Sequence, residues 1–169
     1  MYKEKNPTRE RLRSKTPGCI PPLRIRVALP RDVEALTRLL GELFRQEAEF
    51  NPEPRRQRRA LRALLARGDE ALVLVAERGP DAVGMVTLQA LISTATGGSS
   101  AWLEDMVVTA AERGRGTGSA LMKAAMTEAR RRRWTRISLL TDADNSRAHK
   151  FYRKHAFAAS PMRPFRRMI

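Results

Sequence analysis

The feature that most constrains the fold is a run of three glycines at alternate positions in the segment 112–119 (ERGRGTGS). The segment lies between a predicted strand and a predicted amphipathic helix. Glycine lets the backbone bend and approach a ligand closely, so several backbone N–H groups can point into one concavity at the positive end of the helix. Arg113 and Arg115 add formal positive charge. We therefore expect this segment to bind a pyrophosphate group.

Two other phosphate-binding motifs do not fit this segment. A P-loop ends in Gly-Lys-Ser/Thr, where this chain has Gly118, Ser119 and Ala120. A dinucleotide fingerprint has its third glycine three residues after the second, whereas Gly118 follows Gly116 by two. A glycine-rich turn without a ligand is the remaining alternative, although glycines at a helix start reduce stability.

The periodicity of apolar residues predicts an α/β (α+β) domain. It indicates a strand, two helices, three strands, a helix, a strand and a helix, and the chain from residue 157 is expected to return as one or two strands. Hairpins mixed with helical crossovers favour a mixed, mostly antiparallel sheet of six to seven strands flanked by about four helices. The predicted strands are 23–28, 71–76, 82–94, 102–108 and 136–141, and the predicted helices lie at 30–50, around 61–68, from about 116, and at 145–155.

The N-terminal segment differs in composition from the rest of the chain. Residues 1–22 are rich in charge and proline without an apolar period, so we expect a flexible basic leader there and a single domain over 23–169. Cys19, the single cysteine, excludes an internal disulfide. No apolar run is long enough to span a bilayer, and no secretory signal is recognisable. We expect a cytoplasmic protein without membrane contact.

The chain is strongly basic, with 33 Lys and Arg against 18 Asp and Glu and a formal charge of +15. Such a field attracts polyanions, so one interpretation is binding to nucleic acid or to the ribosome. Aromatic residues make up only 5% of the sequence, and no stacking platform is visible, which favours a solvated basic surface instead. A third interpretation is that the charge helps to capture an anionic cofactor.

Two motifs together resemble the GNAT superfamily of N-acetyltransferases. Residues 103–108 (LEDMVV), followed by 113–118 (RGRGTG), are similar to the central family motif, whose pattern Gln/Arg-x-x-Gly-x-Gly/Ala is matched by Arg113, Gly116 and Gly118. Asn145-x-x-Ala-x-x-Phe-Tyr, ending in Phe157, resembles the second motif. One departure is Ala156, where the family usually has glycine; if that site has a left-handed backbone, alanine costs about 1 kcal/mol.

The resemblance implies a GNAT fold and an acetyl-CoA-dependent enzyme. The family moves an acetyl group to a primary amine by direct attack in a ternary complex, and we expect a small-molecule acceptor. The glycine-rich loop would hold the pyrophosphate, and the preceding strand would bond to pantetheine through its backbone. The implied cofactor-binding residues are Met106, Val107, Val108, Arg113, Gly114, Arg115, Gly116, Thr117, Gly118, Ser119, Asn145 and Tyr152.

The resemblance also implies two catalytic residues. Tyr152 would donate a hydrogen bond to the leaving thiolate, with a purely structural core aromatic as the alternative. Glu104 would be the base, acting through water, with a solvent-facing strand carboxylate as the alternative. Asp105 is expected on the opposite strand face. Asn145 could equally be a plain helix N-cap. His149 and His155 show no metal-ligand spacing, so we expect no metal.

The acceptor and the partners stay open at this point. Glu47, Glu49 and Glu53, in the link between the first two helices, could seat a cationic amine or could be ordinary surface charges. Other possibilities are a CoA-binding sensor without turnover, a protein acetyltransferase, and a nucleic-acid-associated protein. A homodimer is possible by analogy with the family.

Overall fold

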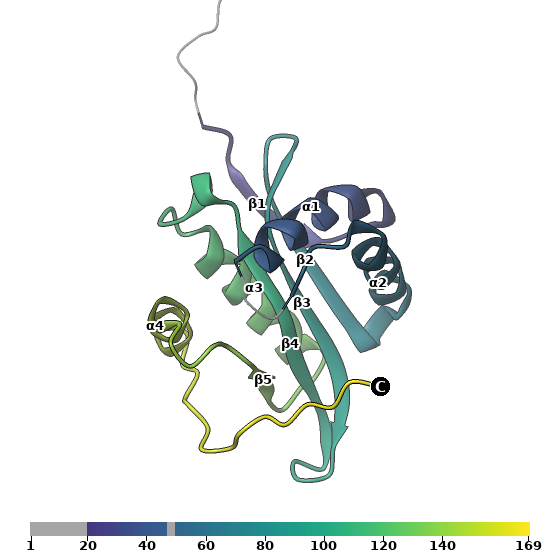
Figure 1. Ribbon diagram of the computed structural model, residues 1–169, viewed down its shortest axis with the longest axis vertical. Helices are drawn as coiled ribbons and strands as arrows, with labels where there is room; N and C mark the ends of the chain where they lie inside the picture. Colours follow the sequence, from purple (N-terminus) through teal and green to yellow (C-terminus); the bar gives the residue numbers. More distant parts are fainter. Residues whose placement is uncertain (1–19, 47–49) are drawn as a thin grey trace, which may run out of the picture.

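The computed structural model describes residues 20–46 and 50–169, and its centre is one mixed sheet (Figure 1). The strand order is β1-β2-β3-β4-β5, in which neighbours up to β4 are antiparallel and β5 runs parallel to β4. Two hairpins therefore join β2, β3 and β4, whereas the parallel strand requires a helical crossover. The strands are β1 (Leu23–Val27), β2 (Ala71–Arg78), β3 (Asp81–Ser93), β4 (Gly98–Val108) and β5 (Ile137–Leu139).

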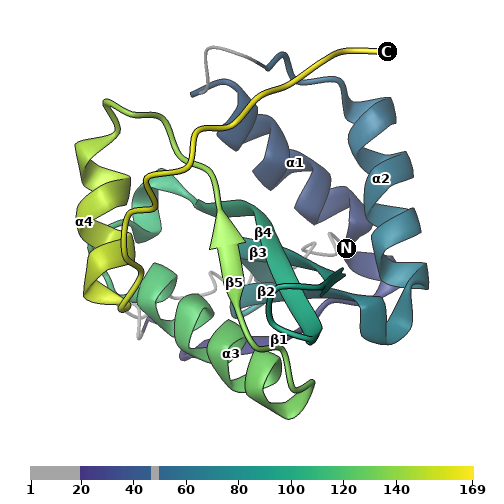
Figure 2. The same cartoon turned by 90° about the horizontal axis from the view of Figure 1, so that it is seen from below.

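Helices cover both faces of the sheet, as the view from below shows (Figure 2). The helices are α1 (Val33–Phe44), α2 (Pro54–Ala66), α3 (Thr117–Arg131) and α4 (Ser146–Lys154). On β2, Val73 and Val75 pack toward α1 and α2, whereas Leu72 and Leu74 pack toward α3. This strand is apolar at successive positions because both of its faces are buried. The sheet thus separates an α1/α2 side from an α3/α4 side.

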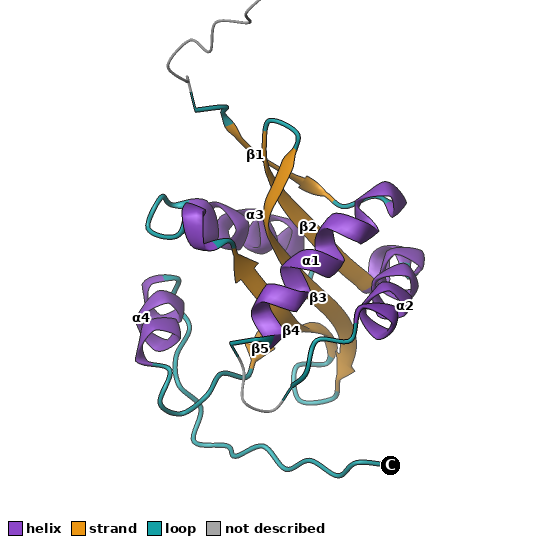
Figure 3. Cartoon of the chain, turned by 45° about the horizontal axis from the view of Figure 1, so that its top comes forward, coloured by secondary structure: helices purple, strands orange, loops and turns teal. Residues whose placement is uncertain are grey.

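The strands β3 and β4 lie side by side (Figure 3), and a β-bulge interrupts their pairing. Val86 pairs with Met106 and Leu88 pairs with Leu103, so the single residue Thr87 lies opposite two residues, Glu104 and Asp105. An extra residue in one strand breaks the alternation of side chains between the two faces. Two consecutive side chains can then lie on the same side of the sheet.

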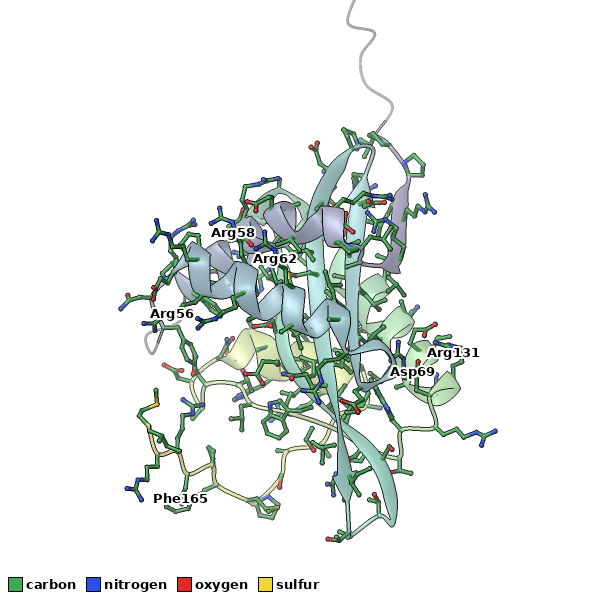
Figure 4. The ribbon with its side chains drawn as sticks, turned by 90° about the vertical axis from the view of Figure 1, so that its right-hand side faces the viewer. Arg56, Arg58, Arg62, Asp69, Arg131 and Phe165 are labelled. Carbon is green, nitrogen blue, oxygen red and sulfur yellow. The ribbon has the colours of Figure 1, made fainter. Side chains whose placement is uncertain are left out.

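The C-terminal segment corrects part of the sequence-based prediction. Within the described residues the sheet has five strands rather than six to seven, and residues 157–169 form no strand. Pro161 and Pro164 lack the N–H that a sheet ladder requires, which disfavours pairing of this segment. Phe165 is 97% exposed and lies on the tail that runs away from the sheet (Figure 4).

Other boundaries are close to their predicted positions. The helix α2 begins at Pro54, ahead of the leucines at 61, 64 and 65 by which the sequence indicated it. Its arginine-rich first turns carry little apolar signal, while proline at N1 suits a helix start. Ala156, after α4, has a φ of 64°, which confirms a left-handed backbone at the position where the family usually has glycine. The Phe157 N–H donates to the Tyr152 carbonyl over 3.1 Å and the Ala156 N–H to the Arg153 carbonyl over 3.0 Å, which is a Schellman helix end.

Two further predictions are the basic leader at the N-terminus, which contains Cys19, and the lack of a membrane span. Cys19 and most of the predicted leader fall outside the described residues. None of the helices in the described part combines the length and the apolar character that a membrane span requires.

Candidate active site

The glycine-rich segment forms an open turn at the start of α3. Gly114 and Gly116 have φ values of 76° and 86°, a conformation that side chains with a Cβ adopt only with strain. A Cβ at either position would meet no atom within 4 Å, so both glycines border open space. Gly118 differs, because a Cβ there would be 3.5 Å from the Phe151 ring. Two glycines thus shape the turn, and the third lets α3 pack closely against α4.

The backbone N–H groups of this turn are available to a ligand. The first amides of a helix have no intrahelical acceptor, and Ala120 is the first whose N–H reaches back to a carbonyl, that of Gly116 at 2.9 Å. Within the described part of the chain, no carbonyl accepts from the N–H of Thr117, Gly118 or Ser119. Unbonded amides at a helix start carry positive partial charge, so the turn can hold an anion.

A buried carboxylate ties the two ends of the turn together. Glu112 accepts a hydrogen bond of 2.8 Å from the Thr117 hydroxyl and another of 2.8 Å from Arg78 Nε, and it is only 5% exposed. The Thr117 hydrogen bond and then the Arg78 guanidinium lower the pKa of the Glu112 carboxyl. Sequence reasoning missed this role, because Arg78 lies 34 residues away on β2. No local pattern could have indicated the pairing.

The two arginines of the turn point to different surroundings. Arg113 donates to the Gln46 Oε1 atom at 2.7 Å and lies within 3.4 Å of the Val108 carbonyl. Arg115 stays at the surface, with 43% of its side chain exposed and its Nη1 3.6 Å from Glu112 Oε1. Arg115 is therefore the more accessible of the two cations beside the turn.

The strand pair next to the turn diverges. β5 pairs with β4 at Ala101, Trp102 and Leu103, and within the described residues the ladder goes no further. The edge of β4 that follows, which includes Met106, Val107 and Val108, is left without a parallel neighbour. Peptide groups on such an edge can bond to an extended ligand as they would to another strand.

Helix α4 brings the second motif beside the turn. The Asn145 side chain accepts from the Ala148 N–H at 3.0 Å, which confirms the N-cap alternative for this residue. Tyr152 is half-buried, with its ring 5.5 Å from Phe151 and 5.7 Å from Phe157 in edge-to-face geometry. These contacts fix the plane of the phenol ring.

A Ser–His contact joins α3 to the end of α4. Ser119 Oγ lies 3.0 Å from His155 Nε2, and the centroid of the His155 ring lies 4.8 Å from that of Phe151 with the two rings tilted by 52°. Burial, followed by the charges of Lys154 and Lys123, lowers the pKa of His155. The imidazole is consequently neutral near pH 7 and can share a hydrogen bond with the serine hydroxyl.

On the other face of β4, a cavity of about 400 Å³ lies between the sheet and the helices α1 and α2. Glu104 and Asp105 both line it, so the expectation that they point to opposite faces was wrong. The bulge opposite Thr87 is the reason. Glu104 is exposed, whereas Asp105 is buried. The remaining lining residues are Leu40, Phe44, Arg56, Gln57, Ala60, Leu61, Ala63, Leu64, Arg67 and Gln89.

Asp105 has few partners for a buried acid. Its Oδ2 accepts a 2.7 Å hydrogen bond from the Thr87 hydroxyl, which in turn accepts from the Asp105 N–H at 3.0 Å. Burial, with a smaller contribution from the neighbouring charge of Glu104, raises the pKa of Asp105 to about 6, against the lowering effect of the Thr87 hydrogen bond. A carboxyl group with a shifted pKa in a cavity is a frequent mark of a functional site.

Gln57 is a second polar side chain of this cavity that sequence reasoning missed. It is 8% exposed, and its Oε1 has no hydrogen-bond partner within the described residues. One signal was present, because Gln57, Leu61 and Leu64 follow helical spacing and the glutamine thus lies on the apolar stripe of α2. Of the glutamates considered in the helix link, Glu47 and Glu49 lie outside the described residues, and Glu53 forms a surface ion pair with Arg56 at 2.7 Å.

A larger cavity, of about 640 Å³, shares the lining residue Arg67 with the cavity beside α2. Asp69 and Arg131 line it, and Figure 4 shows both at the edge of the molecule, apart from Arg56, Arg58 and Arg62 on α2. None of its lining residues belongs to the predicted site. Within the described ranges, no cluster of three or more His, Cys, Asp or Glu residues could hold a metal ion.

Comparisons with known proteins identify the family of this chain. The family model described as Acetyltransferase (GNAT) family matches residues 33–157, and the chain belongs to this family. Comparison with curated proteins gave no match. The mixed sheet with four helices is the GNAT fold, and members of the family use acetyl-CoA to transfer an acetyl group. This chain is accordingly an acetyltransferase by family and fold.

Several solved structures share the fold of this chain, although the proteins carry different functional names. A transcriptional regulator from Bacillus halodurans C-125 is 28% identical with a TM-score of 0.75, covering 86% of this chain and 99% of that one. An aminoglycoside acetyltransferase from an uncultured soil metagenomic sample is 22% identical with a TM-score of 0.72, covering 87% and 96%. A ribosomal-protein-alanine N-acetyltransferase from Brucella melitensis biovar Abortus 2308 is 23% identical with a TM-score of 0.68, covering 87% and 100%. The last two support the fold alone.

Proposed function

We propose that this chain transfers the acetyl group of acetyl-CoA to a primary amine of a small molecule, by direct attack in a ternary complex. One observation carries the proposal. The two sides of β4 hold complementary halves of a site, with an open turn of unbonded amides beside α3 and a cavity lined by Glu104 and Asp105 beside α2. The first half suits an anionic donor and the second suits a cationic acceptor.

The residues of the donor side fit acetyl-CoA. The backbone from Arg113 to Ser119 would hold the diphosphate, since Gly114 and Gly116 leave the space in front of the amides open. The unpaired edge of β4 at 106–108 would bond to the pantetheine arm, and one of its N–H groups would polarise the thioester carbonyl. The Asn145 side chain already caps α4, so we expect it to contribute less than the turn.

The chemistry requires two proton movements, for which two side chains are available. Glu104 takes a proton from the acceptor ammonium through a water molecule. The nitrogen lone pair then attacks the thioester carbon, so that a C–N bond forms, the C–S bond breaks and the electron pair goes to sulfur. Tyr152 supplies a hydrogen-bonded proton to the thiolate, and the amide product loses its second proton to solvent. Glu104 afterwards releases its proton to solvent and Tyr152 regains one, so the ammonium and acetyl-CoA yield the amide, CoA with a free thiol and one proton.

The test of this function is calorimetric titration of the full chain with acetyl-CoA, followed by measurement of thiol release with a panel of amines. We expect saturable binding with one site per chain, and CoA release that depends on the amine. Absence of heat from acetyl-CoA on well-folded protein would contradict the donor site. Binding without thiol release for any amine would instead favour a CoA-binding sensor over an enzyme.

A further inference from the structure

The end of α4 meets the start of α3 beside the glycine-rich turn, through Ser119 and His155. Ser119 Oγ lies 3.0 Å from His155 Nε2, and both residues are half-buried. Ser119 is the third residue of α3, and the Cα–Cβ bonds of a helix tilt toward its N-terminus. Its hydroxyl is therefore directed toward the end of α3 where, in the described part of the chain, the N–H groups of residues 117–119 lack a carbonyl acceptor. A ligand held by these amides can reach the hydroxyl.

The imidazole of His155 is held in place by groups other than Ser119. The His155 N–H donates to the Tyr152 carbonyl over 2.9 Å, within the turn that ends α4. The centroid of the imidazole lies 4.8 Å from that of the Phe151 ring, and a Cβ at Gly118 would be 3.5 Å from the same Phe151 ring. Phe151 thus lies next to both His155 and the first turn of α3. Because this packing fixes the imidazole, the hydrogen bond to Ser119 is available for a role besides joining the helices.

The hydrogen bond between the two side chains can run in either direction. A neutral imidazole has one N–H donor and one acceptor nitrogen, and a partner of one nitrogen decides which of the two carries the proton. Among the described residues, His155 Nδ1 has no hydrogen-bond partner, and it is not one of the fully buried unpartnered atoms. Water can therefore bond to Nδ1 in both tautomers, and no protein group fixes the tautomer.

An anion at the turn decides between the two directions. If the Ser119 hydroxyl donates to His155, its lone pairs face the anion and repel it. If His155 Nε2 carries the proton and donates to Ser119 Oγ, the hydroxyl proton is free for a phosphate oxygen. A hydrogen bond to a charged acceptor is about twice as strong as one between neutral groups, so the anion favours the second direction.

We propose that His155 is a positioning residue for the acetyl donor: it donates from Nε2 to Ser119 Oγ, so that the serine hydroxyl donates its own proton to the diphosphate of acetyl-CoA. The inference rests on the proposed use of acetyl-CoA. Because His155 acts through Ser119, its effect concerns the affinity for the diphosphate and not the chemistry of the thioester. A lysine here would only donate and a carboxylate would only accept, whereas the neutral imidazole takes the role that the ligand requires.

The first experiment compares two acetyl donors, acetyl-CoA and S-acetylpantetheine, which lacks the diphosphate. Their affinities for the full chain would be measured by calorimetry, directly for acetyl-CoA and by competition for S-acetylpantetheine. We expect His155→Phe, which keeps an aromatic ring beside Phe151, to weaken acetyl-CoA about tenfold and to leave S-acetylpantetheine unchanged. The matched control is His149→Phe, because His149 is also on α4 but its Nε2 lies 2.9 Å from the Asp142 carbonyl. The control should keep both affinities.

A double-mutant cycle tests whether His155 acts through Ser119. Ser119→Ala should weaken acetyl-CoA by about tenfold or more, because the hydroxyl that contacts the diphosphate is lost. Adding His155→Phe to this variant should cause no further loss, since the hydroxyl that the imidazole directs is already absent. Losses that multiply would show that the two side chains act independently, which would overturn the inference.

The second experiment observes the tautomer itself. Nitrogen-15 NMR distinguishes an imidazole protonated at Nδ1 from one protonated at Nε2, and the chain has two histidines to assign. With acetyl-CoA bound to the wild type, we expect the His155 proton on Nε2. The Nδ1–H tautomer in that complex would overturn the inference. Because this measurement needs no substitution, it decides the matter even if His155→Phe does not fold.

The outcomes separate this inference from the proposed function. If acetyl-CoA gives no heat with the well-folded wild type, the function fails and the inference fails with it. If acetyl-CoA binds but His155→Phe keeps the wild-type affinity, or loses affinity equally for both donors, the function stands and the inference is overturned. An equal loss for both donors would show that His155 only supports the packing of α4 against α3.

Discussion

Two buried carboxyl groups, Glu112 beside α3 and Asp105 beside α2, lie in opposite electrostatic environments. Glu112 accepts from Thr117 and Arg78, and the pKa of its carboxyl is lowered. Asp105 accepts from Thr87 beside the charge of Glu104, and burial raises the pKa of its carboxyl to about 6. Glu112 stabilises the fold in its charged form, whereas ionisation of Asp105 destabilises the fold. The difference indicates a structural role for Glu112 and a ligand-binding role for Asp105.

The same contrast extends to the two regions around these acids. The turn at the start of α3 is held by satisfied side chains and presents its backbone, so its shape is independent of a ligand. The cavity beside α2 presents side chains, among them the buried Asp105, which no cation pairs within the described residues. We infer that the donor side is preorganised, while the acceptor side has polar groups that a substrate completes.

The donor side should be most sensitive at Gly116. In Gly116→Val, a side chain enters the open space before the amides and the backbone at φ 86° is strained, so we expect acetyl-CoA affinity to fall at least a hundredfold. The control is Gly97→Val in the β3–β4 turn, where φ is 66° and the space is equally open. Both variants should melt earlier, but the control should keep its affinity in calorimetry. Equal affinity loss in both would remove the turn from the site.

Tyr152 of α4 acts, in the proposed function, on the thiolate that leaves when the acetyl group passes from donor to acceptor. Tyr152→Phe should therefore lower turnover by an order of magnitude or more, because the phenol that protonates the thiolate is lost. The edge-to-face contacts with Phe151 and Phe157 remain, so affinity for acetyl-CoA should be nearly unchanged. Steady-state kinetics with calorimetry measures both. Unchanged turnover would leave Tyr152 with packing alone.

For the structural acid, Glu112→Gln should lower the melting temperature by several degrees near pH 7, because Arg78 loses its charged partner. The pKa of Glu112 is lowered from its ordinary 4.5, so this stabilisation is present above that value and disappears as the pH falls through the folded-state pKa. The gap between the wild type and the variant should close in acid. Glu70→Gln, at a 69% exposed ion pair, should change the melting temperature little at any pH.

For the acid of the cavity, Asp105→Asn should raise stability at pH 7.5, by on the order of 2 kcal/mol. A pKa raised to about 6 means that wild-type stability falls as the pH rises from about 4 through 6, and asparagine removes this loss. Denaturant unfolding at about pH 4 and at pH 7.5 measures the free energy of unfolding of both proteins, and Asp81→Asn, at an exposed position, is the control. Destabilisation at both pH values would show that Asp105 is structural, like Glu112.

Much of the layout followed from local patterns in the sequence. The turn at 112–119, the helix after it and the strands β2 to β4 were predicted, because glycine spacing and apolar periodicity are read over a few neighbouring residues. Ala156 has a left-handed backbone, which is the condition under which the second motif indicated a cost for alanine in place of glycine. The C-terminal strands were predicted wrongly, since an apolar tail containing Pro161 and Pro164 pairs only if a sheet edge accepts it.

The sequence by itself determined where the backbone bends and which segments are apolar, and with these the family and the donor-side turn. Only the tertiary structure decided the acceptor side. A single extra residue opposite Thr87 turned Asp105 toward the same cavity as Glu104, and α2 brought Gln57 to that cavity. Glu112 likewise found Arg78 across 34 residues of chain. Contacts of this kind depend on strand register and helix packing, which one-dimensional periodicity does not specify.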